Sequence, residues 1–158
     1  MFAIPLGRGP NGEKLGYGVC RQLGELEVEF YDFRSNVLPT PEDVRRAHIL
    51  FTTWVSNLPF KSGAWTKIGH LSLSGQLPVV FCKQDAETGA LSVIEGGHAR
   101  PATFEECEGR EPAAMWNSAQ IEARLTDHFC GRPNKRLEAL KPKPFPNAPA
   151  TADTPPGY

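Results

Sequence analysis

Several features that would point to one class of protein are missing from this sequence. The formal net charge of its 158 residues is only −1, so no global electrostatic attraction to nucleic acid or to an anionic membrane is expected. No apolar run approaches the roughly 18 residues that a membrane-spanning helix needs. No basic leader precedes a long apolar stretch, so we expect no signal peptide and predict a cytoplasmic protein.

Motifs that bind phosphates or build common active sites are also missing. There is no Gly-x-x-x-x-Gly-Lys-Ser/Thr loop, and no Gly-x-Gly-x-x-Gly that leads into a helix. No Gly-x-Ser-x-Gly sequence is present to form the nucleophile elbow of a hydrolase. The motif content therefore favours a protein that is not an enzyme, and it assigns no catalytic residue, no metal site and no cofactor.

Four cysteines, Cys20, Cys82, Cys107 and Cys130, are spread widely along the chain. None stands in the Cys-x-x-Cys spacing that is typical of structural zinc sites. Because thiols stay reduced in the cytoplasm, we expect four free thiols that are inert or pack as small apolar side chains. A nucleophilic Cys/His pair stays open as an alternative, since such residues meet in space and not in sequence.

The residues that are present favour short strands over long helices. Hydrophobic residues make up 40% of the chain, enough for one core, while 15 glycines and 15 prolines imply many turns. Leu26, Val28 and Phe30 alternate with Glu25, Glu27 and Glu29, which predicts a half-buried strand with an acidic outer face. A hairpin turn is expected where Gly89 can take a positive φ. The turn spacing predicts about six to eight short strands.

Helix signals occur at three places. Thr40 can cap a short helix, and Thr103 with Glu106 forms the capping box of a single helical turn. The longest helix is predicted over residues 112–129, because Pro112 suits a first turn and the segment carries an apolar stripe. Together these elements predict a single α+β domain: a strongly bent antiparallel sheet, partly barrel-like, with one main C-terminal helix packed on it.

The C-terminal segment differs in composition from the rest of the chain. Six of the 18 residues from Lys141 to Tyr158 are proline, and no hydrophobic periodicity is present. We therefore predict a domain over residues 1–140 and a Pro-rich tail over 141–158 that is disordered or extended. The sequence leaves the role of this tail open.

Charge is segregated in the second half of the chain. Seven acidic and two basic residues between Asp85 and Glu111 give a net charge of −5, and five basic and one acidic residue between Arg132 and Lys143 give +4. Such segregation can mark partner surfaces, and two solvated faces also explain it. All three tryptophans are expected in the core. If one of them is exposed as an anchor for a partner, the sequence favours Trp65. The candidate partner-binding residues are Glu105, Glu106, Glu108, Glu111 and Trp65.

The order of segments along the chain resembles a known family. The opening IPL and GYG (residues 4–18) are followed by the GAW and IG pieces (63–69) and by the R-x-A-T-x-E-E-C stretch (100–107). A tryptophan and the pattern E-x-R-L-x-D-H (122–128) come after them. Over residues 2–135 this arrangement resembles the immunity protein 26 family of bacterial polymorphic toxin systems. The Pro-rich tail lies outside the resemblance.

The resemblance implies a small α+β protein that is made beside a toxin and neutralises it in the producing cell by steric occlusion. Its partner would be the cognate protein toxin, with no membrane and no nucleic acid involved and an oligomeric state that the sequence does not specify. Two alternatives stay open. One is a nucleic-acid-binding or regulatory module that uses Arg132, Lys135 and Arg136 on a bent sheet, and the other is a cryptic Cys/His enzyme.

Overall fold

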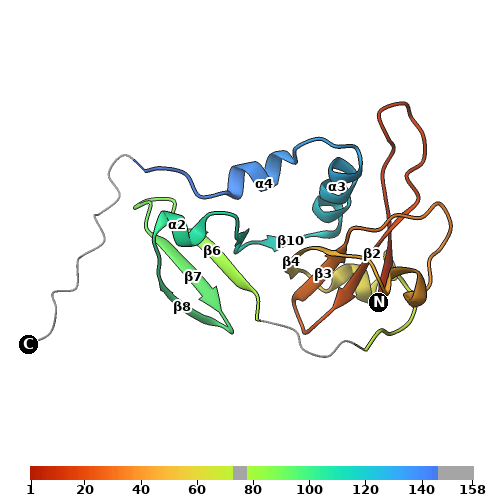
Figure 1. Cartoon of the computed structure of the whole chain (residues 1–158), viewed down its shortest axis with the longest axis horizontal. Coiled ribbons are helices and arrows are strands. Elements are labelled where there is room, and N and C mark those ends of the chain that lie inside the picture. Colours follow the sequence, from red (N-terminus) through yellow and green to blue (C-terminus); the bar gives the residue numbers. More distant parts are fainter. Residues whose placement is uncertain (73–77, 146–158) are drawn as a thin grey trace, which may run out of the picture. The chain divides into compact units, whose positions relative to one another are not determined.

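The computed structural model describes residues 1–72 and 78–145, which fall into two compact units (Figure 1). Each unit has its own sheet and its own buried side chains, so each is described by itself. Unit 1 comprises the described residues of 1–77 and 114–140, and unit 2 comprises those of 78–113 and 141–158.

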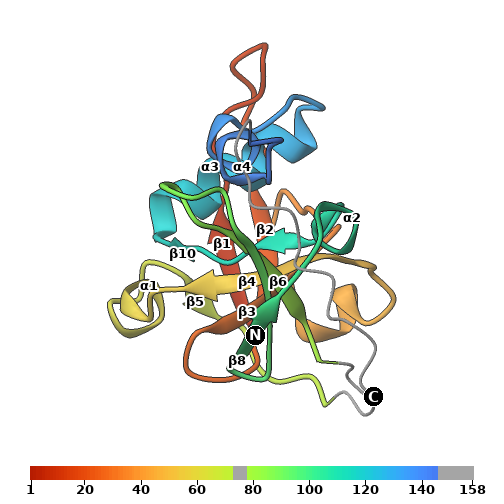
Figure 2. The same cartoon turned by 90° about the vertical axis from the view of Figure 1, so that its left-hand side faces the viewer.

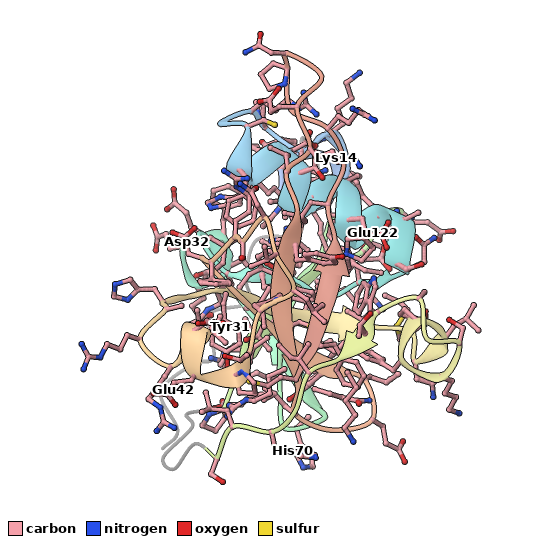
Figure 3. All side chains as sticks on the ribbon, turned by 90° about the vertical axis from the view of Figure 1, so that its right-hand side faces the viewer. Lys14, Tyr31, Asp32, Glu42, His70 and Glu122 are labelled. Atoms are coloured by element: carbon pink, nitrogen blue, oxygen red, sulfur yellow. A yellow bond between two sulfur atoms is a disulfide. The ribbon has the colours of Figure 1, made fainter. Side chains whose placement is uncertain are left out.

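Unit 1 is built on one six-stranded sheet. Its strands are β1 (Phe2–Pro5), β2 (Tyr17–Gln22), β3 (Glu27–Tyr31), β4 (Ile49–Val55), β5 (Thr66–Lys67) and β10 (Met115–Trp116). They lie in the order β10-β4-β3-β2-β1-β5, and every neighbouring pair is antiparallel except β10 with β4. The sheet curls strongly, which confirms the predicted bent and partly barrel-like sheet (Figure 3).

Buried side chains gather on both faces of this sheet. Successive side chains of a strand point to opposite faces, so Val19 and Cys20 of β2 belong to different buried clusters. The larger cluster contains Trp65 and Trp116, and the smaller one contains Tyr31. Unit 1 is therefore held together by large apolar and aromatic side chains packed on two sides of one sheet.

Four short or medium helical segments accompany the sheet of unit 1. Thr40 precedes the 3-10 helix η1, and its backbone N–H donates to the Asp43 carboxylate over 2.8 Å, as the predicted short capped helix requires. The main helix α3 buries Ile121 and Leu125 in the larger cluster, which confirms a C-terminal helix packed on the sheet. The segments are η1 (Pro41–Val44), α1 (Leu58–Lys61), α3 (Ser118–Phe129) and α4 (Lys135–Leu140).

The predicted start of the long helix at Pro112 is wrong. The helix begins at Ser118, and the side chain of Asn117 accepts a hydrogen bond from the backbone N–H of Gln120 over 2.9 Å. The preceding residues form β10 instead, in which Trp116 pairs with Val55 of β4. Pro112 itself lies in the strand β9 (Glu111–Pro112), where it pairs with Cys82, and these tertiary pairings override the local preference of proline for a first helical turn.

The predicted acidic outer face of β3 is wrong at Glu29, which is only 1% exposed. Its carboxylate accepts a hydrogen bond from the Tyr31 hydroxyl and lies 2.9 Å from Arg21 Nε. Arg21 also donates to the carbonyl of Leu71 over 3.2 Å. A buried carboxylate needs such partners to be tolerated, and the alternation of residues along β3 does not reveal that both faces are covered.

Unit 2 is built on a four-stranded sheet with the order β8-β7-β6-β9. Figure 1 labels β6, β7 and β8 of this sheet, and Figure 2 labels β6 and β8. Gly89 has φ 74° in the turn between β6 and β7, which confirms the predicted hairpin. The described residues of both units contain ten strands, more than expected, because β5, β9 and β10 are two-residue segments recruited by their neighbours. The elements of unit 2 are β6 (Val80–Gln84), β7 (Leu91–Glu95), β8 (His98–Pro101), α2 (Phe104–Cys107) and β9 (Glu111–Pro112).

A disulfide joins Cys82 of β6 to Cys107 of α2, so the expectation of four free thiols is wrong for this pair. The helix α2 packs against β6 and β7, and this places the two Cα atoms 5.3 Å apart. The two residues are 25 positions apart in the sequence, which hides their proximity. With Val93 they make up the buried cluster of unit 2.

The first residues of the predicted tail are extended along unit 2. Lys143 N–H donates to the side-chain oxygen of Gln84 over 3.0 Å, and the Gln84 amide donates to the Lys143 carbonyl over 2.7 Å. The remaining residues of the predicted tail, 146–158, lie outside the described residues. The division into a domain over 1–140 and a tail over 141–158 therefore stays a prediction.

Candidate functional site

The acidic candidates of unit 2 are placed mainly by α2. The Thr103 hydroxyl accepts from the Glu106 N–H over 3.2 Å, and the Glu106 carboxylate accepts from the Thr103 N–H over 3.0 Å. This confirms the predicted capping box. Glu105 lies in the first turn, and Glu108 follows the last helical residue. Glu111 lies apart from them on β9, where it is half-buried.

The carboxylate of Glu106 is already engaged within unit 2. Arg100 Nη2 lies 2.9 Å from Glu106 Oε1. The hydrogen bond from Arg100, with that from the Thr103 N–H, holds the pKa of Glu106 below its ordinary value. Glu105 and Glu108 are exposed, and neither side chain has an ion pair or hydrogen bond to another described residue. Of the predicted glutamates, these two are therefore the ones available to a partner.

Three further exposed acids belong to unit 2. Asp85 accepts hydrogen bonds from the Thr88 N–H over 2.7 Å and from the Glu87 N–H over 3.0 Å. These bonds lower the pKa of Asp85, and the bond from the Thr88 N–H has the largest effect. The structure places these acids on the β6–β7 turn and at the end of β7, not on one helix face. We refer to the exposed acids of unit 2 as the acidic surface: Asp85, Glu87, Glu95, Glu105 and Glu108.

A pocket of about 370 Å³ lies over β6, β7 and β8 of unit 2. Its lining includes one acid, Asp85, and two cations, Lys83 and Arg100, together with small apolar side chains. A lining of mixed charge suits a polar contact with a protein surface and does not select one class of small ligand.

Trp65, the tryptophan named as a candidate anchor for a partner, is 1% exposed in unit 1. Its burial agrees with the expectation that the tryptophans lie in the core, and it argues against an exposed anchor at this position. Its ring packs edge-on against Phe60 and Phe30, and its Nε1–H donates to the Glu122 carboxylate over 3.0 Å. The sequence KSGA before it indicates a surface turn, but α1 and α3 cover the ring that follows. Its candidate role in binding a partner stays untested.

A pocket of about 760 Å³ lies beside this tryptophan. Phe2, Phe60 and Trp65 line it together with Glu25, Lys61 and Lys67. The pocket thus combines aromatic walls with charges of both signs, and nothing in its geometry favours one catalytic reaction.

Three of the four cysteines in the described residues are buried or paired, and Cys130 is a free thiol of intermediate exposure. Cys20 is fully buried, and this burial raises the pKa of its thiol, which opposes formation of the reactive thiolate. Cys82 and Cys107 are joined in the disulfide. Among residues 1–72 and 78–145, no cysteine sulfur is hydrogen-bonded to a histidine ring; His128 instead lies 2.9 Å from Asp32.

The basic residues of the nucleic-acid alternative are partly used inside unit 1. Arg132 pairs with Asp127, and the guanidinium of Arg136 lies over the Trp116 ring and donates to the Met115 carbonyl. Two of the three predicted phosphate-binding side chains therefore have structural partners, which weakens this alternative.

Sequence reasoning missed one group of charges in unit 1. Arg8 and Lys14 form an isolated β-bridge with each other in the hairpin between β1 and β2. In the stretch GRGPNGEK, turn-forming residues separate Arg8 from Lys14, so a tight hairpin places the two cations opposite each other. This spacing is the sequence pattern from which the pair could have been predicted.

Neither a cluster of metal-binding side chains nor a membrane-spanning helix occurs in the described residues. No three His, Cys, Asp or Glu side chains in residues 1–72 and 78–145 lie together so that they could hold a metal ion. Likewise, none of the helices described by the structure has the length and apolar character needed to cross a membrane.

Comparison with known proteins gives one match. The sequence model of a protein family described as Immunity protein 26 matches residues 1–90, more than half of the chain. These residues span β1 to β5 and η1 and α1 of unit 1, and the β6 strand and following turn of unit 2. Neither the curated proteins nor the solved structures contain a significant match to the chain.

Proposed function

The chain belongs to the immunity protein 26 family, and from this premise we propose that it binds a cognate bacterial toxin and neutralises it by steric occlusion. The family match over residues 1–90 is the observation that carries the proposal. Occlusion requires exposed complementary side chains on a stable frame and no catalytic group of the inhibitor's own. The buried aromatic residues of unit 1 supply such a frame.

We propose the acidic surface of unit 2 as one region that contacts the toxin. Glu105 and Glu108 support this choice because they are exposed and carry charge that no described residue neutralises. A toxin with a basic surface, such as a nuclease, would be attracted to these carboxylates during diffusion. Opposite charge speeds encounter and disfavours incorrect partners, which is the property that an inhibitor of one particular toxin needs.

Coexpression tests the function itself. The tagged chain is produced together with the protein encoded beside it, and growth is compared with that of cells that make the neighbour alone. We expect the neighbour to be toxic, to co-purify with this chain and to lose its toxicity when both are present. A neighbour that neither binds nor kills would remove the proposed function.

Charge reversal tests the acidic surface. In the double variant Glu105→Lys/Glu108→Lys, association with the toxin should slow by about tenfold or more at low salt, and the difference should shrink as salt is added. The matched control is Glu25→Lys/Glu42→Lys, which makes the same change in net charge at exposed positions of unit 1. Equal association rates for the two variants would remove the acidic surface from the proposal and leave the function standing.

A further inference from the structure

The hairpin between β1 and β2 carries two cations that face each other. Its backbone pairs Leu6 with Gly16 through a 2.9 Å hydrogen bond, and Arg8 and Lys14 are bridged directly opposite each other further out. Figure 1 shows this hairpin extending away from its own sheet, and Figure 3 shows Lys14 on it. Directly opposed residues of two antiparallel strands project from the same face, and like charges there destabilise the pairing. The pair of like charges therefore lowers the stability of the hairpin, which calls for a reason other than folding for both cations to be present.

The nearest acid of the hairpin lies on its other face. Glu13 neighbours Lys14, so its side chain leaves the ladder on the opposite side. Its carboxylate accepts a hydrogen bond from the Asn11 N–H over 3.0 Å and packs so closely over Gly9 that a Cβ atom there would lie 2.0 Å from it. Glu13 is thus tied to the hairpin backbone and does not neutralise the face that carries Arg8 and Lys14.

A pocket of about 690 Å³ opens on the basic face of this hairpin. Arg8, Lys14, Tyr17 and Asn36 line it, with no acidic side chain among the lining residues. Both cations are exposed, and neither has an ion pair with a described residue. One hydrogen bond of Arg8 goes to the hairpin itself, from Nη1 to the Gly12 carbonyl over 2.7 Å. We refer to Arg8, Lys14 and their pocket as the basic hairpin.

The base of the hairpin is fixed to the rest of unit 1. Gly7 N–H donates to the hydroxyl of Thr126 on α3 over 3.0 Å, and Arg34 donates to the Leu15 carbonyl over 2.9 Å. Gly16 has φ 80°, and a Cβ atom there would lie 2.1 Å from the Ser35 carbonyl oxygen. These contacts hold the pocket in place before any partner arrives, which lowers the ordering cost of binding.

Exposed apolar residues that follow the pocket residue Asn36 in the chain favour a protein over a small anion. Val37 and Leu38 directly follow Asn36 in the chain and are 72% and 51% exposed. A free phosphate would use the cations and leave these side chains in water, whereas a protein segment would cover both. The GRGPNG stretch has the glycine spacing of a dinucleotide-binding loop, but it is followed by β2 and not by a helix whose N-terminus would hold a phosphate.

We propose that the basic hairpin receives a carboxylate-bearing segment of the toxin, with Arg8 and Lys14 pairing to its acids and Val37 and Leu38 covering apolar atoms beside them. For the identity of the partner this inference rests on the proposed function. It adds a contact on the family-matched part of the chain, with a charge opposite to that of the acidic surface. The two contacts therefore require opposite charges on the toxin and can be separated by mutation.

Arg8→Glu is the decisive variant. It places a glutamate opposite Lys14, so the like-charge pair becomes an attractive cross-strand pair and folding should be unchanged or slightly improved. Association with the toxin should nevertheless slow by about tenfold or more at low salt, because the attraction for the toxin's acids is lost. Arg8→Lys should keep fast association. Arg46→Glu makes the same change in net charge at an exposed residue just after η1, and it should change the association rate little.

A second measurement follows the full-length chain by NMR during titration with an acetylated hexaglutamate peptide. Amide shifts are expected at residues 7–8, 14–16 and 36–38, and they should vanish in Arg8→Glu. Inorganic phosphate and a single-stranded oligonucleotide are titrated in parallel, and both should bind these residues more weakly than the peptide.

The outcomes separate the two proposals. If the wild type binds the toxin and Arg8→Glu binds it equally fast, the basic hairpin is wrong and the immunity function stands. If no toxin is bound by the wild type, the function fails and the hairpin is judged on the titration alone. Absent shifts, or tighter binding of phosphate or oligonucleotide than of the peptide, would overturn recognition of a carboxylate segment.

Discussion

The two units of this chain reach a folded state by different means. Unit 1 buries Trp65, Trp116 and Phe30 in one cluster, and a second cluster that includes Tyr31 lies on the other face of its curled sheet. The buried cluster of unit 2 consists of Val93 and the two half-cystines Cys82 and Cys107. Unit 2 is therefore a small sheet held by a covalent link, while unit 1 is held by apolar area removed from water.

This difference teaches that one stability value does not describe the chain. Reducing agents should act on unit 2, and truncation of aromatic residues should act on unit 1. The two can be followed separately because Trp54, Trp65 and Trp116 all belong to unit 1. Tryptophan fluorescence thus reports unit 1, and hydrogen exchange of β6 and β7 reports unit 2.

The largest effect is expected from Trp65→Ala. Removal of this buried ring leaves a cavity against Phe30 and Phe60, and it should lower the free energy of unfolding of unit 1 by about 3–5 kcal/mol. Urea unfolding followed by the fluorescence of the remaining tryptophans measures the loss. Leu58→Ala, at a side chain that is 68% exposed, is the control and should change it by less than about 0.5 kcal/mol. Equal losses in the two variants would contradict the aromatic core of unit 1.

Loss of the disulfide should have the next largest effect, and on the other unit. The link closes a loop of 25 residues, so its removal in Cys82→Ser/Cys107→Ser should destabilise unit 2 by about 3 kcal/mol. A loss of stability of this size should accelerate hydrogen exchange in β6 and β7 by about 100-fold. Tryptophan fluorescence should not change. Unchanged exchange after reduction would show that unit 2 does not depend on the link.

Alkaline pH should weaken unit 1 by a smaller amount as far as about pH 10, and by more above it. Burial raises the pKa of the Tyr31 hydroxyl, aided by its hydrogen bond to Glu29, and burial also raises that of the Cys20 thiol. Both groups stay protonated in the folded state at pH values where the unfolded chain releases the proton. Their contribution to stability is therefore complete below about pH 8 and is lost as the pH rises through the ordinary pKa of each group, that of the thiol first.

Urea unfolding between pH 8 and pH 11 measures this loss in unit 1. Above the ordinary pKa of each group, stability should fall by about 1.4 kcal/mol per pH unit and per group. Tyr31→Phe removes one of the two groups and should flatten the profile above pH 10, while Tyr17→Phe, at a half-buried tyrosine of β2, serves as the control. A Tyr31→Phe profile as steep as that of the wild type would show that Tyr31 does not contribute.

The smallest effect is expected at the capping box of unit 2. Thr103→Ala removes the acceptor for the Glu106 N–H and should destabilise α2 by about 1 kcal/mol. Exchange of the Glu106 amide measures this change. Thr103→Ser, which keeps the oxygen, should behave like the wild type, and a loss in that variant would argue against the cap.

Features that depend on near neighbours in the chain could be predicted from the sequence. The Thr103–Glu106 capping box and the Gly89 turn each join residues only a few positions apart, so their geometry follows from local chemistry. The long helix was predicted from its apolar stripe, but its start was misplaced. Local signals at Pro112 could not reveal that Trp116 pairs with a distant strand.

The candidate site was predictable only in part. The acidic composition of residues 85–111 correctly indicated exposed carboxylates, but it did not reveal that Arg100 neutralises Glu106 and leaves Glu105 and Glu108. The basic hairpin was not predicted, because turn-forming residues indicate a loop but do not determine which side chains lie opposite each other. That register is decided by the backbone pairing.

By itself the sequence determined the α+β class, the bent sheet, the C-terminal helix, the local turns and caps, and membership of the immunity protein 26 family. Only the tertiary structure decided that Glu29 is buried and that Cys82 meets Cys107, 25 positions further along the chain. The same holds for Trp65, which is covered and is hydrogen-bonded to Glu122, 57 positions away. The physical reason is that burial and long-range pairing depend on which segments fold over one another, and no pattern within a short stretch of chain carries that information.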